Sequence, residues 1–427
     1  MRGNGDSWRK YRWHWKCAEK TVLTEKLIHY FRQIPDYRCG REKRHDLGEM
    51  LVCVTLGFLC GRTTIRRSLK WCKTHLEELR KHMNLKYGIA SPSTITRMLN
   101  GIDEELALYA FMEWIGEIVE SRNTHLAIDG KALCGATEKT KDETTPMLLN
   151  VVETVRGLIL AQLPVDSKTN EITAIPELLK LLDISGSIVT IDAVGTQTAI
   201  MEQIHEQGGH FVLTVKKNQP EAYEEIHTFM DKLGAEDLKR KKGEAMDPGM
   251  KEFLEKYEEI SQMEKNRDRN EYRTCQICKD ASNLTKSQKE WPHVQSIGRI
   301  KQVRIPKEKD SQGNDVTPSK EEFLEKGSRR IPAPSAGEGA GKDVQCTALI
   351  SDLILTAEEL GSIKRMHWSI ENRLHHVLDD TFREDRSPAK KSRNNLSLIR
   401  KYAYNILRLA MYETGLANIM TEMMDCF

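Results

Sequence analysis

The sequence lacks any long uninterrupted apolar run. Its longest apolar stretch, residues 47–60, contains Glu49 and falls short of the ~20 residues that a bilayer-spanning helix needs. The first residues, Met-Arg-Gly-Asn-Gly-Asp, continue into a polar segment and lack the apolar core of a secretory signal. We therefore expect a cytoplasmic protein with no membrane partner.

Cysteine is too sparse for a disulfide-stabilised secreted domain, since ten cysteines are spread over 427 residues. Reduced thiols in a cytoplasm are the simpler interpretation. Cys275 and Cys278 have C-x-x-C spacing, but a zinc ribbon needs a second pair or two histidines nearby. We favour a buried strand over residues 272–278 instead of a zinc site.

The sequence has almost no excess of charge of one sign. The 65 Lys and Arg residues and 63 Asp and Glu residues leave a net charge of +2, which alone argues against nucleic acid as a partner. Hydrophobic residues make up 39% and charged residues 30%, proportions that exclude a membrane protein and a disordered chain. At about 150 residues per domain, the length predicts two or three domains.

The basic residues are nevertheless gathered in four segments. Residues 1–45 carry twelve basic and five acidic residues, a balance of +7. Residues 61–81, 286–309 and 383–401 each carry seven basic and two acidic residues, a balance of +5. A protein that is neutral in total can still present such patches to phosphates, although mixed charge is also typical of solvated helices.

Residues 20–122 have the pattern of a helical region. Apolar or amphipathic helices are expected over residues 21–34, 47–59, 66–83 and 106–118. The sequence Ser91-Pro-Ser93 is a helix-start signal. The helix that follows, with Thr94, Thr96 and Arg97, could be the second helix of a helix-turn-helix, in which Arg97 contacts DNA. An ordinary bundle helix is the simpler alternative.

After residue 122 the pattern changes to short buried strands. Strands are expected over residues 125–129, 147–155, 158–165, 187–192 and 210–216, with helices over residues 173–182 and 196–207. Three strands thus precede an alternation of helix and strand, which predicts a mixed α/β unit.

Residues 221–345 interrupt this alternation. They predict a helix over 221–233, a charged segment compatible with a helix over 239–265, strands over 272–278 and 294–305, and a Gly- and Pro-rich loop over 310–343. Strong helices are expected again over residues 356–382 and 396–411.

Two of the expected strands end in an aspartate, Asp129 and Asp192. Ligands commonly bind at the carboxyl ends of buried strands, and two carboxylates on adjacent strands would come within reach of one ion. Ligation by oxygen alone suits Mg²⁺ or Mn²⁺. The alternative is that each aspartate only caps the turn that follows it.

A stripe of polar residues along the late helix offers a third acid. His367, Glu371, His375 and Asp379 follow one another at intervals of four and share one face. Glu371 could complete a carboxylate site, the His-Glu-His set could bind zinc, or the stripe could be solvated surface.

Seven short motifs follow one another in order, at residues 34–38, 91–93, 127–133, 165–178, 189–197, 217–219 and 367–385. Together they resemble the DDE transposases of bacterial insertion sequences, and in particular the H-repeat-associated, Rhs-linked branch. Cys134, His376 and Asp380 depart from the residues usual in that family.

The resemblance implies a ribonuclease-H-like mixed-sheet catalytic core, with an insertion after its fifth strand and an α-helical N-terminal domain before it. It implies that Asp129, Asp192 and Glu371 are the catalytic triad and hold two Mg²⁺ or Mn²⁺ ions. The triad residues are separated by 63 and 179 residues. The implied domains are residues 1–122, which bind DNA ends, 123–220, 221–350 as the insertion, and 351–427.

The resemblance also implies the function and the partners. The expected protein is an endonuclease that cuts and joins insertion-sequence ends by metal-dependent phosphoryl transfer. It would act as a homodimer on terminal inverted repeats and target DNA, associated with the bacterial nucleoid. Lys131, Lys217, Arg365 and Asn372 are expected to contact DNA, with Arg97. A decayed or domesticated, non-catalytic DNA-binding protein is the alternative.

Overall fold

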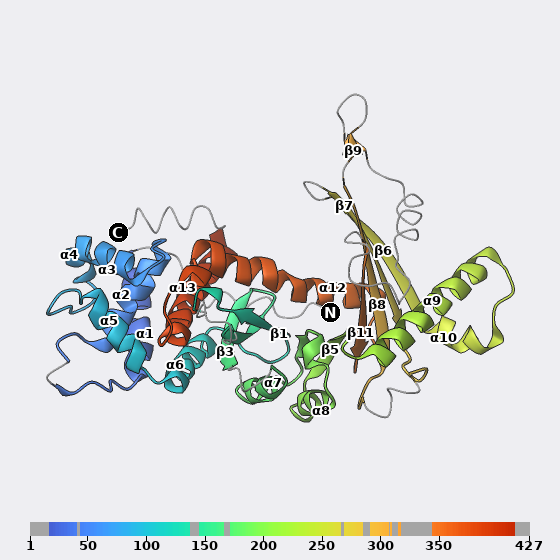
Figure 1. Cartoon of the computed structure of the whole chain (residues 1–427), viewed down its shortest axis with the longest axis horizontal. Helices are drawn as coiled ribbons and strands as arrows, with labels where there is room; N and C mark the ends of the chain where they lie inside the picture. Colours follow the sequence, from blue (N-terminus) through green and yellow to red (C-terminus); the bar gives the residue numbers. More distant parts are fainter. Residues whose placement is uncertain are drawn as a thin grey trace. The chain divides into compact units, whose positions relative to one another are not determined.

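The computed structural model describes residues 17–40, 43–136, 145–165, 171–265, 269–284, 291–306, 308–309, 315–316 and 344–414. Figure 1 shows the fold, which is mixed α/β. The Gly- and Pro-rich loop expected over residues 310–343 falls outside the described residues, apart from positions 315–316. Residues 166–170, which belong to the motif at 165–178, also fall outside the described residues. So do parts of the basic segments 1–45 and 286–309.

The chain forms two compact units, and neither unit is continuous in sequence. The first contains Met1–Ser121, Asp129–Asn170 and Ser369–Phe427, and the second contains Arg122–Ile128 and Glu171–Trp368. The chain therefore passes between the units inside a strand, at residues 128–129, and inside a helix, at residues 368–369.

The first unit begins with helices, as expected for residues 20–122. They are α1 (Cys17–Gln33), α2 (Leu47–Leu59), α3 (Ile65–Thr74), α4 (Leu76–Leu79), α5 (Pro92–Gly101) and α6 (Glu104–Gly116). Side chains of Asp46, Thr64, Ser91 and Asp103 cap four of these helices by accepting hydrogen bonds from backbone amides. The single helix expected over residues 66–83 is wrong, because the chain leaves helical geometry at His75 and divides into α3 and α4.

The last described helix, α13 (Arg393–Thr414), belongs to the core of these N-terminal helices. The Tyr402 ring lies 4.7 Å from the Phe31 ring, 4.8 Å from the Phe111 ring and 4.7 Å from the Trp114 ring, measured between centroids. Figure 1 shows α13 beside α1 and α2. The two ends of the described chain therefore share one hydrophobic core.

Two strands of the first unit form an antiparallel hairpin, β2 (Met147–Glu153) and β3 (Leu158–Val165), as the sequence predicts. The turn between them contains Gly157 at φ +74°, a conformation that favours glycine. Asn405 of α13 accepts a hydrogen bond from the Ile159 amide and donates one to the Ile159 carbonyl, which ties the hairpin to the helix.

The second unit is built on parallel strands extended by antiparallel ones. Strand β1 (His125–Ala132), which ends in the first unit, pairs in parallel with β4 (Ile188–Ile191), and β4 pairs in parallel with β5 (His210–Val215). Antiparallel pairing then adds β11 (Val344–Ser351), β8 (Ser296–Pro306), β7 (Arg269–Cys278) and β6 (Tyr257–Lys265). The strand order is β3-β2-β1-β4-β5-β11-β8-β7-β6, and most of the pairings are antiparallel.

The helices of the second unit are α7 (Glu171–Lys180), α8 (Thr198–Glu206), α9 (Pro220–Lys242), α10 (Lys251–Glu255) and α12 (Ala357–Ile370). Beyond Ile370 the helix continues into the first unit as two π-helical segments, η6 (Glu371–His375) and η7 (Val377–Thr381). The regular helix expected over residues 356–382 is therefore wrong in its second half.

The second unit differs from the expectations at two of its strands and agrees at a third. Residues 257–265 form β6 instead of a helix, because their charges pair across the ladder, with Lys279 bound to Glu258 and Arg273 Nη1 3.0 Å from Glu264 Oε2. Strand β11 was not expected. Cys275 and Cys278 are buried in β7, which confirms the strand interpretation of the C-x-x-C pair.

Candidate active site

Asp129 and Asp192 each follow one residue of a pair on neighbouring parallel strands. Asp192 comes just past the end of β4, but the expected end of the first strand at Asp129 is wrong, because β1 continues to Ala132. In the β1–β4 ladder Ile128 is opposite Ile191, and Asp129 and Asp192 are the next residues in the sequence. Both isoleucines are buried, with 1% and 3% of their surface exposed. The buried apolar run thus ends at paired residues in the two strands, and an aspartate follows it in each case.

Asp192 is held by a lysine from the adjacent parallel strand. Lys216 Nζ donates a hydrogen bond of 2.6 Å to Asp192 Oδ2 just past the end of β5. Burial acts to raise the pKa of Asp192, but the hydrogen bond and charge of Lys216, together with the charge of Lys364, hold that pKa below its usual range. Asp192 is therefore a charged carboxylate at neutral pH.

Sequence reasoning missed Lys216 and singled out Lys217 instead. A lysine just beyond a strand that runs parallel to the Asp192 strand was the available signal. It also missed Glu171, at the start of α7, where burial and then the charge of Asp192 raise the pKa of the carboxyl. A second acid therefore lies within the electrostatic range of Asp192.

Helix α12 is fixed to the strands of the second unit by two buried polar side chains. His367 Nδ1 lies 2.9 Å from Thr190 Oγ1 in β4, and Lys364 Nζ donates a hydrogen bond of 2.8 Å to Thr214 Oγ1 in β5. His125 Nε2 of β1 also lies 3.1 Å from Thr190 Oγ1. One threonine of β4 thus joins the strand on one side to the helix that packs on it.

Both of these histidines are neutral at physiological pH. Burial lowers the pKa of His125 to about 4. Burial and then the charge of Lys364 hold the pKa of His367 well below its usual range. His367 is thus an uncharged hydrogen-bonding residue that sets the position of α12, one turn before Glu371.

In the first unit, Asp129 lies against the π-helical segment η6. Asp129 Oδ1 accepts a hydrogen bond of 3.0 Å from the Gly130 amide, and Asp129 Oδ2 lies 3.8 Å from His375 Nδ1. Burial, and then the charge of Lys131, lower the pKa of His375 to about 4, so this contact is not an ion pair. A neutral histidine of η6 thus lies near Asp129.

Glu371 is the first residue of η6 and is exposed. It follows His367 by four residues and precedes His375 by four. One turn before Glu371, His367 is bonded to Thr190 of β4 in the second unit, and one turn after it, His375 lies near Asp129 in the first unit. Single π-helical turns inside α-helices are frequent at functional sites.

Lys131 is placed differently from its expected contact with DNA. Its side chain is 4% exposed, and Nζ donates hydrogen bonds to Asp379 Oδ1 at 2.6 Å and Asp385 Oδ1 at 3.3 Å, with Glu384 Oε2 at 3.6 Å. Burial acts to lower its pKa, but the charges of these carboxylates raise it above the usual value. Lys131 is thus a permanent interior cation that joins β1 to the segment after Glu371.

The other residues expected to contact DNA are exposed. Lys217 follows β5, Asn372 lies on η6, and Arg97 lies on α5, where its carbonyl accepts a hydrogen bond from Tyr37. Arg365 on α12 is also exposed, but Arg365 Nη1 lies 3.0 Å from Glu264 Oε1.

Within the part of the chain that the structure describes, no group of three or more His, Cys, Asp or Glu side chains is spaced to hold a metal ion. Each histidine of the His-Glu-His stripe has its own contact, His367 with Thr190 and His375 with Asp129.

Comparison with known proteins identifies the class. The family described as "Transposase DDE domain" matches residues 120–406, more than half of the chain, and the family described as "DDE_Tnp_1-associated" matches residues 28–115. The chain therefore belongs to the DDE transposase family, and it is a DNA transposase. Enzymes of this family generally use divalent metal ions.

Its relatives define the branch. The chain is 28% identical to the "H repeat-associated putative transposase YhhI" of Escherichia coli strain K12, over 90% of each chain. It is 32% identical to "H repeat-associated putative transposase YbfD" of the same strain, over 46% of this chain and 78% of that protein. The resemblance to H-repeat-associated transposases is confirmed.

A solved structure, the cryo-EM structure of a piggyBac transposase synaptic complex with hairpin DNA, has 10% identity and a TM-score of 0.39. The match covers 95% of this chain and 78% of that chain, but the likeness is too low to carry an argument. No described helix combines the length and the apolar character that a bilayer crossing requires.

Proposed function

We propose that the chain cuts insertion-sequence ends and joins them to target DNA, with Asp129, Asp192 and Glu371 as its catalytic triad. The observation that carries this proposal is the β1–β4 register, in which both aspartates directly follow Ile128 and Ile191, a buried pair on parallel strands. The hydrogen bond between Thr190 and His367, one turn before Glu371, supports the third residue. Family membership favours this enzyme over a non-catalytic DNA-binding protein.

The proposed core is ribonuclease-H-like. The order β3-β2-β1-β4-β5, with β2 and β3 antiparallel and β1, β4 and β5 parallel, supports that topology. We assign residues 221–350 to an insertion after the fifth strand, residues 1–122 to an N-terminal DNA-end-binding domain, and residues 123–220 and 351–427 to the core.

The donor set fits a hard divalent cation, because the three triad residues offer only carboxylate oxygens. Asp192 is ionised at neutral pH, as a metal ligand must be. We propose two Mg²⁺ or Mn²⁺ ions, which when bound would polarise the scissile phosphate and neutralise charge during transfer. Lys216, which now holds Asp192 Oδ2, would have to release it to the metal.

The residues of the chain mainly position the reacting groups, because phosphoryl transfer needs little covalent chemistry from the protein. Attack of water on a phosphodiester forms a new P–O bond, breaks the bond to the 3′ oxygen and leaves a 3′-hydroxyl. That hydroxyl then attacks a phosphodiester of target DNA in the same way. Neutral His367, bonded to Thr190, keeps α12, the helix that leads into Glu371, in place on β4.

We further propose a homodimer, since two DNA ends must be brought together, acting in the cytoplasm on nucleoid DNA. Lys217, Asn372, Arg97 and Arg365 are proposed DNA contacts. The first three are exposed, whereas Arg365 would have to leave its ion pair with Glu264.

A cleavage assay tests the triad. The full chain is incubated with Mn²⁺ and a labelled duplex made from the DNA that flanks its gene, and nicked products are separated by electrophoresis. Asp192→Asn and Glu371→Gln should abolish nicking. Glu177→Gln, which changes an exposed acid on α7, should not. Full nicking by either triad variant would refute the assignment.

A further inference from the structure

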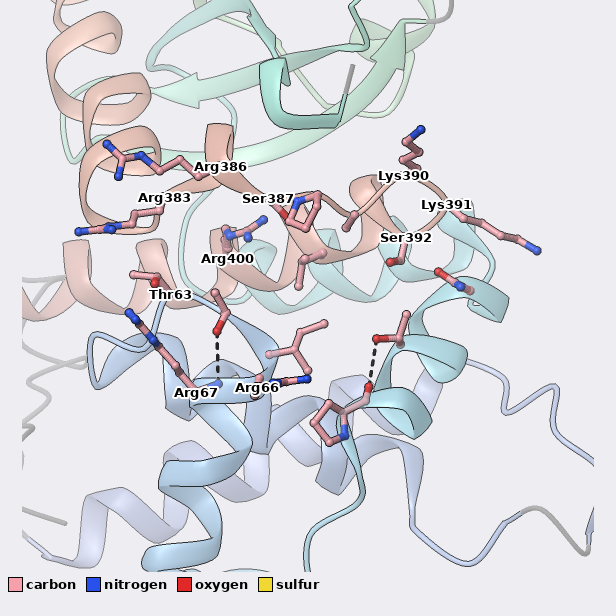
Figure 2. Close-up of a pocket in the computed structure, with 18 residues that line it drawn as sticks. Thr63, Arg66, Arg67, Arg383, Arg386, Ser387, Lys390, Lys391, Ser392 and Arg400 are labelled. Atoms are coloured by element: carbon pink, nitrogen blue, oxygen red, sulfur yellow. Dashed lines mark hydrogen bonds between the residues drawn. The ribbon is translucent and has the colours of Figure 1, made fainter. Parts of the chain in front are cut away.

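The first unit contains a cavity of about 620 Å³ whose charged lining residues are all basic. Its walls come from the start of α3, from α5, and from residues 383–400, which lead from η7 into α13 (Figure 2). The charged residues that line it are Arg66, Arg67, Arg383, Arg386, Lys390, Lys391 and Arg400. Two basic segments of the sequence, residues 61–81 and 383–401, therefore meet in this basic cavity.

The cations of the cavity are on opposite walls. Figure 2 shows Arg66 and Arg67 on the α3 side, and Arg383, Arg386 and Arg400 on the side of the later segment. Arg66, Arg67, Arg383 and Arg386 are exposed, and within the described residues none of them forms an ion pair with a carboxylate. A bound anion would therefore relieve the repulsion among these four positive charges.

Arg400 is the buried member of the set. It is 3% exposed, its guanidinium carbon lies 5.3 Å from the centroid of the Phe58 ring, and Nη1 lies 3.8 Å from Glu384 Oε1. Its Nε has no hydrogen-bond partner among the described residues. Arg400 therefore adds a buried positive charge to the wall of the cavity.

The neutral lining favours the same kind of ligand. Helix α3 begins in the wall with a Thr64 cap and has no acid in its first turn, so its amide end adds partial positive charge. Hydroxyl and amide groups of Thr63, Thr96, Asn100, Ser387 and Ser392 also line the cavity. Its lining contains no aromatic side chain on which a base could stack, which favours phosphate over single-stranded bases.

We propose that the basic cavity binds the sugar-phosphate backbone of the DNA duplex on which the transposase acts. This inference rests on the proposed function, because that function supplies the ligand. Arg383 follows Glu371 by twelve residues and has a left-handed conformation, with φ +52°, that is rare outside glycine. A duplex bound here would thus be held by the segment that directly continues the helix of Glu371.

The test measures duplex binding by the full chain with fluorescence anisotropy over a series of salt concentrations, in EDTA so that no cleavage occurs. Two double variants remove charge from either wall, Arg66→Gln with Arg67→Gln, and Arg383→Gln with Arg386→Gln. Each should weaken binding about tenfold or more, and lower the slope of log affinity against log salt by about two. Thermal melting verifies that each variant is folded.

A matched control removes two exposed cations from the same helix outside the cavity, Lys70→Gln with Lys73→Gln. If this control loses as much affinity as the cavity variants, or if both cavity variants bind like the parent, the proposal is wrong. If the parent binds inorganic phosphate at millimolar concentration, and both cavity variants lose the phosphate but bind the duplex like the parent, the cavity is a small-phosphate site and the duplex assignment fails.

The proposal for the cavity and the proposal for the triad can be refuted independently. Asp192→Asn should bind the duplex like the parent while losing nicking. Loss of duplex binding in both cavity variants, with a parent that never nicks DNA, would support the cavity and count against the proposed catalysis.

Discussion

Lys216 Nζ lies 2.6 Å from Asp192 Oδ2, just past the ends of two parallel strands, and it occupies an oxygen of a carboxylate that we propose as a metal ligand. The ammonium group of Lys216 thus takes the place that the proposed metal ion would have beside this oxygen. It keeps Asp192 ionised and in position, at the cost of competing with the metal for one oxygen.

Removal of Lys216 should shift the pH dependence of nicking. Since Lys216 lowers the pKa of Asp192, Lys216→Met should raise that pKa and move the acidic limb of the rate profile to higher pH. The measurement is the nicking rate against pH at saturating Mn²⁺. Lys217→Met, which removes the adjacent exposed cation, should leave the limb in place. An unmoved limb in Lys216→Met would contradict the role of this lysine.

Divalent metal should stabilise the folded chain through the triad carboxylates. A ligand that binds only the folded state raises stability by about 2.7 kcal/mol at one hundred times its dissociation constant. We expect Mn²⁺ to raise the melting temperature, EDTA to reverse the rise, and Asp192→Asn to reduce it. An equal rise in Asp192→Asn and the parent would place the metal elsewhere.

Acid should destabilise the chain well before its carboxylates titrate. His125 and His375 have folded pKa values of about 4, so between pH 6.5 and 4 the unfolded state binds more protons than the folded state. Their stabilising effect is present above pH 6.5 and is lost as the pH falls. By pH 5 each should have cost about 2 kcal/mol relative to pH 7. Urea unfolding at both values measures this loss, which should be smaller in His125→Gln than in the parent.

Lys131 should matter for stability and not for DNA affinity. Lys131→Met leaves buried Glu384 and its neighbours Asp379 and Asp385 without their shared cation, which should cost about 3 kcal/mol of unfolding free energy. Adding Glu384→Gln should recover part of the loss. The exposed control Lys217→Met should change stability by less than about 0.5 kcal/mol. If a folded Lys131→Met variant bound the duplex more weakly than the parent, the result would instead support the contact between Lys131 and DNA that the sequence predicts.

Local pattern was enough to predict most of the N-terminal helices, the β2–β3 hairpin and the buried strand residues that precede Asp129 and Asp192. Buried apolar runs with clear turn signals specify such elements without help from distant residues. Assignment of Asp129, Asp192 and Glu371 as a set depended on family resemblance, because spacing alone could not choose between a metal site and two caps.

The rest depended on partners that are remote in sequence. Strand β6 has charged residues whose ion pairs exist only once β7 lies beside it, and β11 fits between β5 and β8, which the chain formed earlier. The interior position of Lys131 follows from carboxylates about 250 residues away. The anchoring role of neutral His367 required knowledge of Thr190 on a neighbouring strand.

The packing of Tyr402 against Phe31 and Phe111 has a genetic consequence. Any stop codon before residue 393 would remove α13 and leave the N-terminal helices without the centre of their core. We expect the truncated product to be degraded instead of persisting as a folded DNA-end-binding fragment. A damaged copy of this gene would therefore be silent and would not act as a dominant inhibitor of its intact relatives in the same cell.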